Sequence, residues 1–291
     1  MDVPEAIRAI GRVPGIGALE LNYPQHLVGL SEAALAALLA ETGLPLTAFN
    51  LRFDDAAFVA GAFTNPAKET RERAVRLAEE AVVLAGRFEV PHVVLWMEGD
   101  GFDYPFQADY GRLWSWEIEG FRRVARADER VRVSVEYKPS EPRRYALIRT
   151  MGDALLAARD VGSTNFGVTL DICHALMTGE HPPAAAAFAL REGRLFGVHL
   201  NDGTGWGDDG LMAGSVRPWL LLELLAVLRE GGYEGTLYFD TFPVREDAVA
   251  ECASNARAVR RFEALLDRLD LREVAEIHGQ QDAVEARAML D

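Results

Sequence analysis

The stretch VSVEYKPSEP, residues 133–142, alternates like a β-strand and then enters a proline-flanked loop. Side chains two positions apart in a strand point to the same side, so Ser134, Glu136 and Lys138 share one face and the intervening apolar residues share the other. An acid and an amine that point together into a protein interior cost free energy unless another group compensates them. The stretch therefore predicts a strand that ends in a buried polar site.

Other short apolar runs resemble this one and alternate with segments of helical periodicity. The helical segment 32–42, for example, is preceded by Ser31, a typical N-cap, and followed by Gly43, a typical helix stop. Strand–helix alternation at roughly 30 to 45 residues per unit predicts parallel strands with helical crossovers, and so an α/β fold of the TIM (β/α)8-barrel type. The strand-like runs are residues 17–24, 46–53, 92–97, 131–138, 166–172, 195–202 and 235–241.

These runs number seven, one fewer than the eight strands of a complete barrel. The chain opens with PEAIRAIGRV, residues 4–13, which we interpret as the first helix of a barrel whose first strand is absent or unrecognisable. We expect a single domain over residues 1–270, because α/β barrels of this length are often one domain. Residues 271–291 are predicted to form a helical tail that could contact a neighbouring subunit.

Composition excludes several classes of protein. The 30 basic and 45 acidic residues give a net charge of −15, which disfavours nucleic acid and anionic membranes as partners. No apolar run approaches the roughly 20 residues of a membrane helix, and no signal peptide is evident. The two cysteines form no recognisable disulfide framework, so reduced thiols and a cytoplasmic location are expected.

Polar residues occupy the last inward-facing position of the final four strands: Glu136, Asp171, His199 and Asp240. Active sites of barrel enzymes lie at this end of the strands. One carboxylate at a strand end is commonplace, but three carboxylates at one rim would repel one another strongly without a cation. Mostly oxygen ligands with one nitrogen favour Mn²⁺, with Mg²⁺ or Co²⁺ as alternatives.

A second acidic cluster adjoins the first. His174 follows Asp171 by three residues, and Asp208 and Asp209 lie in the glycine-rich loop GTGWGDDG, residues 203–210. His174, Asp208 and Asp209 could hold a second metal ion if this loop folds over the site. Alternatively, the loop is a solvated acidic turn.

Six motifs carry a resemblance to a known family: LNYPQH (21–26), LWMEGDGFDYPFQADY (95–110), EYKPSEP (136–142), LDICH (170–174), HLND (199–202) and FDTFP (239–243). Together they resemble the motifs of the xylose isomerase-like TIM barrels, most closely the L-rhamnose isomerase branch, over about residues 17–265. The family's acidic loop is often D-x-D, whereas here two aspartates are adjacent, so a ligand of the second metal ion would be missing or supplied by another residue.

The resemblance implies an aldose–ketose isomerase that acts on a free monosaccharide. In such an enzyme one metal ion polarises the sugar carbonyl, and a second assists a hydride shift between C1 and C2. The ligands would come from strands five to eight, which agrees with one strand being absent before residue 17. The family tends toward dimers and tetramers, so a homodimer or homotetramer is expected.

Residue roles follow from the matched motifs. Glu136 and Asp240 would bind metal and take part in catalysis, and Lys138 would hold the carbonyl oxygen, unless it only pairs with Glu136. His26 would help to open the sugar ring.

Three further residues are predicted to bind substrate. Trp96 would stack on the sugar, although plain packing is an alternative. Arg52 could bind a hydroxyl group or an acidic neighbour. Asn201 could bind substrate or compete with His199 as a ligand.

Other activities remain open on the same scaffold. A ketose 3-epimerase would use Glu136 and Asp240 as acid and base on opposite sides of one carbon. A polyol lyase or dehydratase and a non-catalytic sugar-binding homologue are further alternatives. A metal-dependent DNA-repair nuclease is disfavoured, because it would need more than these six histidines and a basic face.

Overall fold

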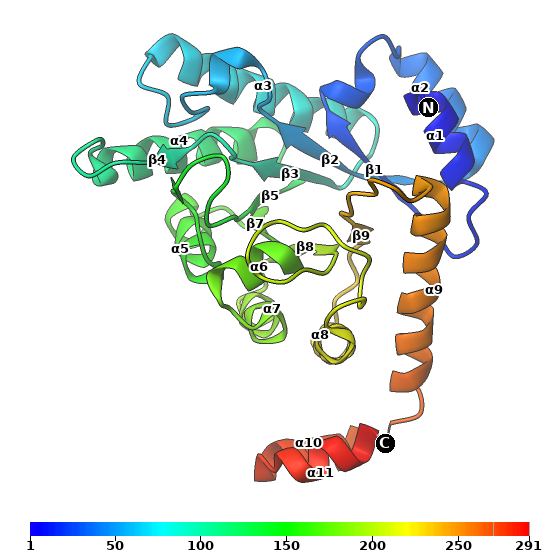
Figure 1. The fold of residues 1–291 in the computed structure, drawn as a ribbon. Coiled ribbons are helices and arrows are strands. Elements are labelled where there is room, and N and C mark those ends of the chain that lie inside the picture. Colours follow the sequence, from blue (N-terminus) through cyan, green and yellow to red (C-terminus); the bar gives the residue numbers. More distant parts are fainter. Residues whose placement is uncertain (270, 291) are drawn as a thin grey trace.

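The protein is a nearly closed parallel barrel surrounded by helices, seen here in a computed structural model that describes residues 1–269 and 271–290 (Figure 1). The strands follow the order β1–β2–β3–β5–β7–β8–β9, and every neighbouring pair is parallel. They are β1 (Leu19–Tyr23), β2 (Leu46–Arg52), β3 (His92–Trp96), β5 (Arg132–Glu136), β7 (Phe166–Asp171), β8 (Leu195–Leu200) and β9 (Leu237–Phe239). All seven lie within the predicted runs.

Helices connect successive strands, and their ends follow the capping residues. Ser31 Oγ accepts a hydrogen bond from the Ala34 amide at the start of α2, and Gly43 ends that helix with φ = 68°. The helices are α1 (Val3–Ile10), α2 (Glu32–Thr42), α3 (Lys68–Arg87), α4 (Tyr110–Ala127), α5 (Met151–Val161), α6 (Ile172–Thr178), α7 (Pro182–Arg191), α8 (Pro218–Glu230), α9 (Ala248–Leu266), α10 (Leu271–Gln280) and α11 (Ala283–Leu290). Two 3-10 turns, η1 (Gln25–Leu27) and η2 (Ala56–Phe58), and a small antiparallel pair, β4 (Gly101–Phe102) and β6 (Tyr145–Ala146), complete the set.

The barrel has seven strands in its described part, as the sequence predicts, and α1 precedes the first of them. Strands β1 and β9 are therefore the two edges of the sheet. A groove lined by Ile16, Ala18 and Leu237, among others, runs between them. Because β9 has only three residues and is partly exposed, the barrel is most open on this side.

The predicted C-terminal tail is helical, as α10 and α11 show (Figure 1). The guanidinium of Arg287 on α11 lies 5.3 Å from the ring centre of Trp219 on α8. The predicted domain boundary involves residue 270, which lies outside the described residues, so that division stays a prediction.

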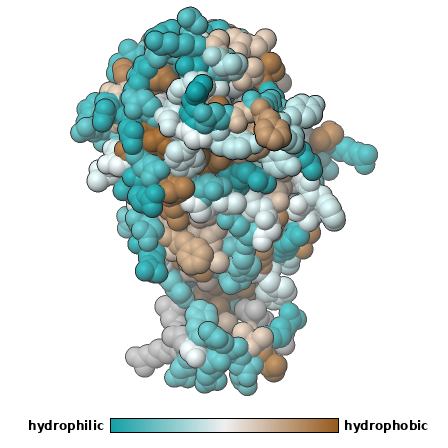
Figure 2. Space-filling model, turned by 90° about the vertical axis from the view of Figure 1, so that its left-hand side faces the viewer, coloured by the Kyte–Doolittle hydropathy of each residue, from teal (hydrophilic) through white to brown (hydrophobic). Residues whose placement is uncertain are grey.

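Hydrophobic side chains are interspersed among hydrophilic ones on the side of the molecule shown in Figure 2. In the described part of the chain, no helix has the length and apolar character needed to cross a membrane.

Parallel pairing aligns the strand ends, and this alignment creates the rim of the barrel. Arg52 on β2 is level with Trp96 on β3, which is level with Glu136 on β5. Further round, Asp171 on β7 is level with His199 on β8. Side chains that are far apart in the sequence are thereby brought to one mouth.

Candidate metal centre

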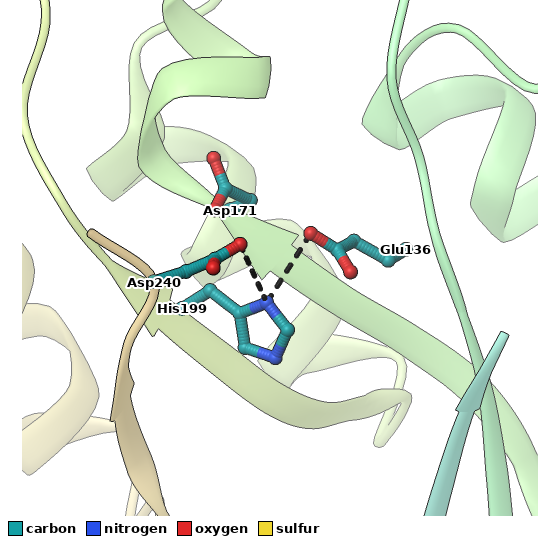
Figure 3. A group of neighbouring side chains, drawn as sticks. All are labelled: Glu136, Asp171, His199 and Asp240. Atoms are coloured by element: carbon teal, nitrogen blue, oxygen red, sulfur yellow. Dashed lines mark hydrogen bonds and ion pairs between the residues drawn. The ribbon is translucent and has the colours of Figure 1, made fainter. Parts of the chain in front are cut away.

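Glu136, Asp171, His199 and Asp240 meet at the mouth of the barrel (Figure 3). Each offers a ligand atom, and these atoms all lie within 4.8 Å of one another. His199 Nδ1 lies 3.2 Å from Glu136 Oε1 and 3.9 Å from Asp240 Oδ2. Three carboxylates and one imidazole form a donor set that suits Mn²⁺, Mg²⁺ or Co²⁺, so the group could hold a divalent cation.

The protein itself compensates these charges only in part. Burial raises the pKa of the Asp171 carboxyl to about 7. Burial alone would lower the pKa of His199, but Glu136 and other acids nearby raise it to about 10. Burial would raise the pKa of Glu136, yet the neighbouring histidines bring it below its ordinary value. Protons on Asp171 and His199 thus supply positive charge that a bound cation could supply instead, and this fits a metal site.

Asp171 is fixed in place by its neighbours. It ends β7 and also caps α6, because its Oδ1 accepts a hydrogen bond from the His174 amide at 2.9 Å. Its Oδ2 accepts a hydrogen bond from Asn201 Nδ2 at 2.8 Å, and Asn201 Oδ1 accepts one from the Cys173 amide. Asn201 is buried and orients Asp171 through this hydrogen bond, while its binding of substrate stays a prediction.

His174 and Asp208 form a second group next to the first. His174 Nε2 lies 3.2 Å from Asp208 Oδ2, and His174 Nδ1 lies 3.4 Å from Glu136 Oε1. His174 Nδ1 and Asp208 Oδ1 are buried and have no hydrogen-bond partner among the residues that the structure describes. Asp208 also lies with Asp171 and Cys173 in a group whose ligand atoms are within 4.8 Å of one another. This group offers a second place for a cation.

Asp209 does not join this group. Its Oδ2 accepts hydrogen bonds from the Thr204 amide at 2.6 Å and from Thr204 Oγ1 at 2.7 Å. The carboxylate therefore closes its own glycine-rich loop, while Asp208, one residue earlier, faces the site. The expectation that both aspartates face one ion lacks support in this geometry.

The positive charge of Lys138 is compensated by two acidic residues that the sequence analysis did not pair with it. Its Nζ lies 2.9 Å from Asp208 Oδ2 and 3.2 Å from Glu141 Oε2. Burial would lower the pKa of Lys138, but these two acids raise it above its ordinary value, so the amine is charged. In the described part of the chain, no ion pair joins Lys138 to Glu136.

The pocket at this mouth brings most of the other predicted residues together. Trp96 and Arg52 line it, with the Arg52 guanidinium 4.4 Å from the centre of the Trp96 ring. His26 lies beside the pocket and is not part of its lining, and its Nδ1 accepts a hydrogen bond from the Asn22 amide at 3.0 Å. Burial, and then the charge of Arg52, lowers the pKa of His26, so this imidazole is neutral at pH 7.

Glu20 on β1 is a buried acid that sequence reasoning missed. Its Oε2 accepts a hydrogen bond from Asn50 Nδ2 at 3.1 Å and lies 3.9 Å from His199 Nε2. Burial raises the pKa of Glu20. The sequence contains a pattern that could have identified Glu20. Glu20 and Asn22 share the inward face of the strand LELNY, just as Ser134 and Glu136 share the inward face of the strand VSVEYK.

Comparisons with known proteins agree with this architecture. The xylose isomerase of Thermus thermophilus is 30% identical over 241 residues, which are 80% of this chain and 62% of that enzyme. The chain thus spans less than two thirds of the length of this curated relative.

Solved structures share the fold at lower identity. A xylose isomerase domain protein from Alicyclobacillus acidocaldarius matches with a TM-score of 0.70 and 20% identity, covering 91% of this chain and 94% of that one. A D-allulose 3-epimerase from Methylomonas sp. matches with a TM-score of 0.71 and 17% identity, covering 89% and 91%. The closer resemblance to L-rhamnose isomerases stays a prediction. The sequence model of one family matches residues 12–261, and the chain therefore belongs to the xylose isomerase-like TIM barrels.

Proposed function

We propose that the protein is a metal-dependent sugar isomerase that interconverts an unphosphorylated aldose and ketose by a metal-assisted hydride shift. The observation that carries this proposal is the convergence of Glu136, Asp171, His199 and Asp240 within 4.8 Å at the barrel mouth. Membership of the family and the similarity to a xylose isomerase support it.

The four rim residues would hold Mn²⁺, with Mg²⁺ or Co²⁺ as alternatives. When bound, the ion supplies a Lewis acid that polarises a carbonyl oxygen and stabilises negative charge developing on it. Asn201 keeps Asp171 in a fixed orientation through its hydrogen bond to Oδ2. His174 and Asp208 would contribute to a second site, with Asp171 between the two.

Lys138 would donate a hydrogen bond from Nζ to a substrate oxygen. Asp208 and Glu141 hold this ammonium group in place and keep it charged. His26 is the group proposed for ring opening. Because its Nδ1 accepts the Asn22 N–H and the ring is neutral, its proton is on Nε2, which can donate to the ring oxygen of a sugar.

A ketose 3-epimerase is the second candidate. Glu136 and Asp240 approach His199 Nδ1 from different strands and leave two carboxylates facing one space (Figure 3). Two such groups can remove a proton from one side of a carbon and return it on the other.

Turnover in deuterated water separates the two reactions. The metal-loaded protein would be incubated with a panel of aldoses and ketoses, and the products would be analysed by NMR. A hydride shift excludes solvent deuterium from the product, whereas proton transfer incorporates it. Absence of metal-dependent turnover across the panel would contradict both enzymes and favour a sugar-binding homologue.

A further inference from the structure

Arg52 occupies a distinctive place at the pocket mouth. It ends β2, level with Trp96, and the central carbon of its guanidinium lies over that ring, 4.4 Å from the ring centre. The same pocket is lined by Glu136, His199 and Asp240. Among the described residues that line this pocket, Arg52 is the only lysine or arginine.

The acids closest to Arg52 along the chain have other partners. Asp54 Oδ1 accepts a hydrogen bond from Gln25 Nε2 at 2.6 Å, and Asp55 Oδ2 pairs with Arg73 at 2.5 Å. In the described part of the protein, no carboxylate lies within ion-pair distance of the Arg52 guanidinium. This contrasts with Lys138, which has two carboxylate partners.

The charge of Arg52 nevertheless acts across the pocket mouth. It contributes to the lowered pKa of His26 on one side and opposes the rise in the pKa of Glu98 on the other. Burial is the larger cause in both residues, and among the described residues no ion pair joins Glu98 to Arg52. The Arg52 charge is thus available to a ligand.

We propose that Arg52 binds a carboxylate of the substrate, so that the site prefers a sugar acid to the corresponding neutral sugar. This inference deepens the proposed function and rests on it. A guanidinium presents two parallel N–H groups that match a carboxylate, and the contact with the Trp96 ring keeps the guanidinium at the pocket mouth.

Charge favours a carboxylate over a phosphate. Four acids, Glu20, Glu136, Asp171 and Asp240, surround the centre of the site, and a dianion would be repelled more strongly than a monoanion. A phosphate group would also call for more donors than the single unpaired fork of Arg52.

The test compares matched substrate pairs with the Mn²⁺-loaded protein. Galacturonate is paired with galactose and glucuronate with glucose, and a sugar phosphate serves as a third arm. For each pair, kcat/KM is measured where turnover occurs, and Kd is measured by calorimetry in every case. We expect the wild type to favour the acid by about 10- to 100-fold, the range for a hydrogen-bonded charged pair.

Variants assign this preference to Arg52. Arg52→Gln should reduce the acid-to-neutral ratio to near one, and Arg52→Lys should retain part of it, because the charge remains and the fork is lost. Arg73→Gln is the matched control, since it removes an arginine from nearby α3 outside the pocket lining and should leave the ratio unchanged.

Two results would overturn the inference. One is an acid-to-neutral ratio near one in the wild type. The other is an acid-to-neutral ratio that is unchanged in Arg52→Gln, which would assign the preference to metal chelation. A preference for the phosphate would replace the carboxylate with another anion and also contradict it. If no sugar is turned over, the proposed function fails, while the ratio of binding constants still decides the role of Arg52.

Discussion

The side chains inside the barrel form a lower and an upper layer, and a residue of the upper layer follows one of the lower layer by two positions on the same strand. The two layers differ in the partners of their polar groups. In the lower layer, His92 Nε2 hydrogen bonds to Ser134 Oγ at 2.7 Å, and Ser134 Oγ to Thr169 Oγ1 at 2.6 Å. In the upper layer, Glu136 and Asp171 follow Ser134 and Thr169 and are ionisable: nearby histidines lower the pKa of Glu136, whereas burial raises the pKa of Asp171 to about 7.

The lower layer is structural. Burial lowers the pKa of His92 to about 3, so its imidazole is neutral. The other two polar side chains of this layer, Ser134 and Thr169, are uncharged as well, and each of the three has a hydrogen-bond partner within the layer. Gly197 leaves space for them, because a Cβ there would lie 2.5 Å from Thr169 Oγ1. The comparison teaches that burial of a polar group does not mark function here. The clustering of ionisable ligand atoms at one rim does, because such a cluster can bind a cation.

Removing one upper-layer ligand should have the largest effect. Glu136→Gln retains the shape of the side chain but loses its charge, and we expect metal-dependent turnover to fall by about 10³-fold or more, since Lewis-acid stabilisation contributes several kcal/mol. Steady-state assays at saturating Mn²⁺ check this. Ser134→Ala, one layer below, is the control and should retain turnover within a few-fold. Equal losses in both variants would erase the distinction between the layers.

Asn201→Ala should loosen Asp171 and weaken metal binding by about 10- to 100-fold, as is usual when the group that orients a ligand is removed. Titration with Mn²⁺ followed by calorimetry measures the change. Asn255→Ala is a suitable control, because Asn255 is also a buried asparagine bonded to a backbone amide, at Ala213, and lies on α9. A metal affinity unchanged by Asn201→Ala would mean that Asp171 is not held for a cation.

Gly197→Ala tests the lower layer. The added methyl would press against Thr169 and His92, so we expect the free energy of unfolding to fall by about 1–3 kcal/mol. Denaturant unfolding provides the measurement. Gly152→Ala, a helical position where the nearest atom to the new Cβ lies 3.6 Å away, should be neutral or stabilising. A fully tolerated Gly197→Ala would show that the lower layer is loosely packed.

Glu117 on α4 tests whether a buried acid outside the rim behaves differently. It is fully buried, and neither carboxylate oxygen has a hydrogen-bond partner in the described part of the chain. Burial, and then the nearby Asp100, raises its pKa well above the ordinary value. The folded state thus retains a proton that the unfolded chain releases above about pH 4.5, and stability declines as pH rises toward the folded pKa. Glu117→Gln removes this loss.

The free energy of unfolding of Glu117→Gln, relative to the wild type, should therefore rise with pH above about pH 4.5 and up to the folded pKa, by up to about 1.4 kcal/mol per pH unit. The exposed neighbour Glu119, changed to Gln, should show no such slope. A flat difference for Glu117→Gln would mean that its carboxyl is ionised in the folded protein.

Much of this arrangement follows from local sequence. The period of two in strands such as VSVEYK places Ser134 and Glu136 on the inward face, and parallel pairing then aligns them with Thr169 and Asp171. The order of α1 before β1 among the described residues was legible for the same reason. These features depend on short-range alternation, which one sequence displays.

The contacts that depend on loops could not be read from the sequence. Lys138 meets Asp208, which is 70 residues away, because the glycine-rich loop folds back over the mouth. Packing between distant segments likewise decides three other features of the site. It turns Asp208 rather than Asp209 toward the site, it places Asn201 beside Asp171, and it leaves Arg52 without an ion pair among the described residues. Sequence periodicity contains no information about such packing.

The most direct test of the central claim is a crystal structure of the Mn²⁺-soaked protein with anomalous scattering recorded at the manganese edge. The account predicts a peak bounded by Glu136, Asp171, His199 and Asp240, with ligand atoms about 2.0–2.6 Å from it. A manganese peak elsewhere, or none between these four side chains at saturating Mn²⁺, would contradict it.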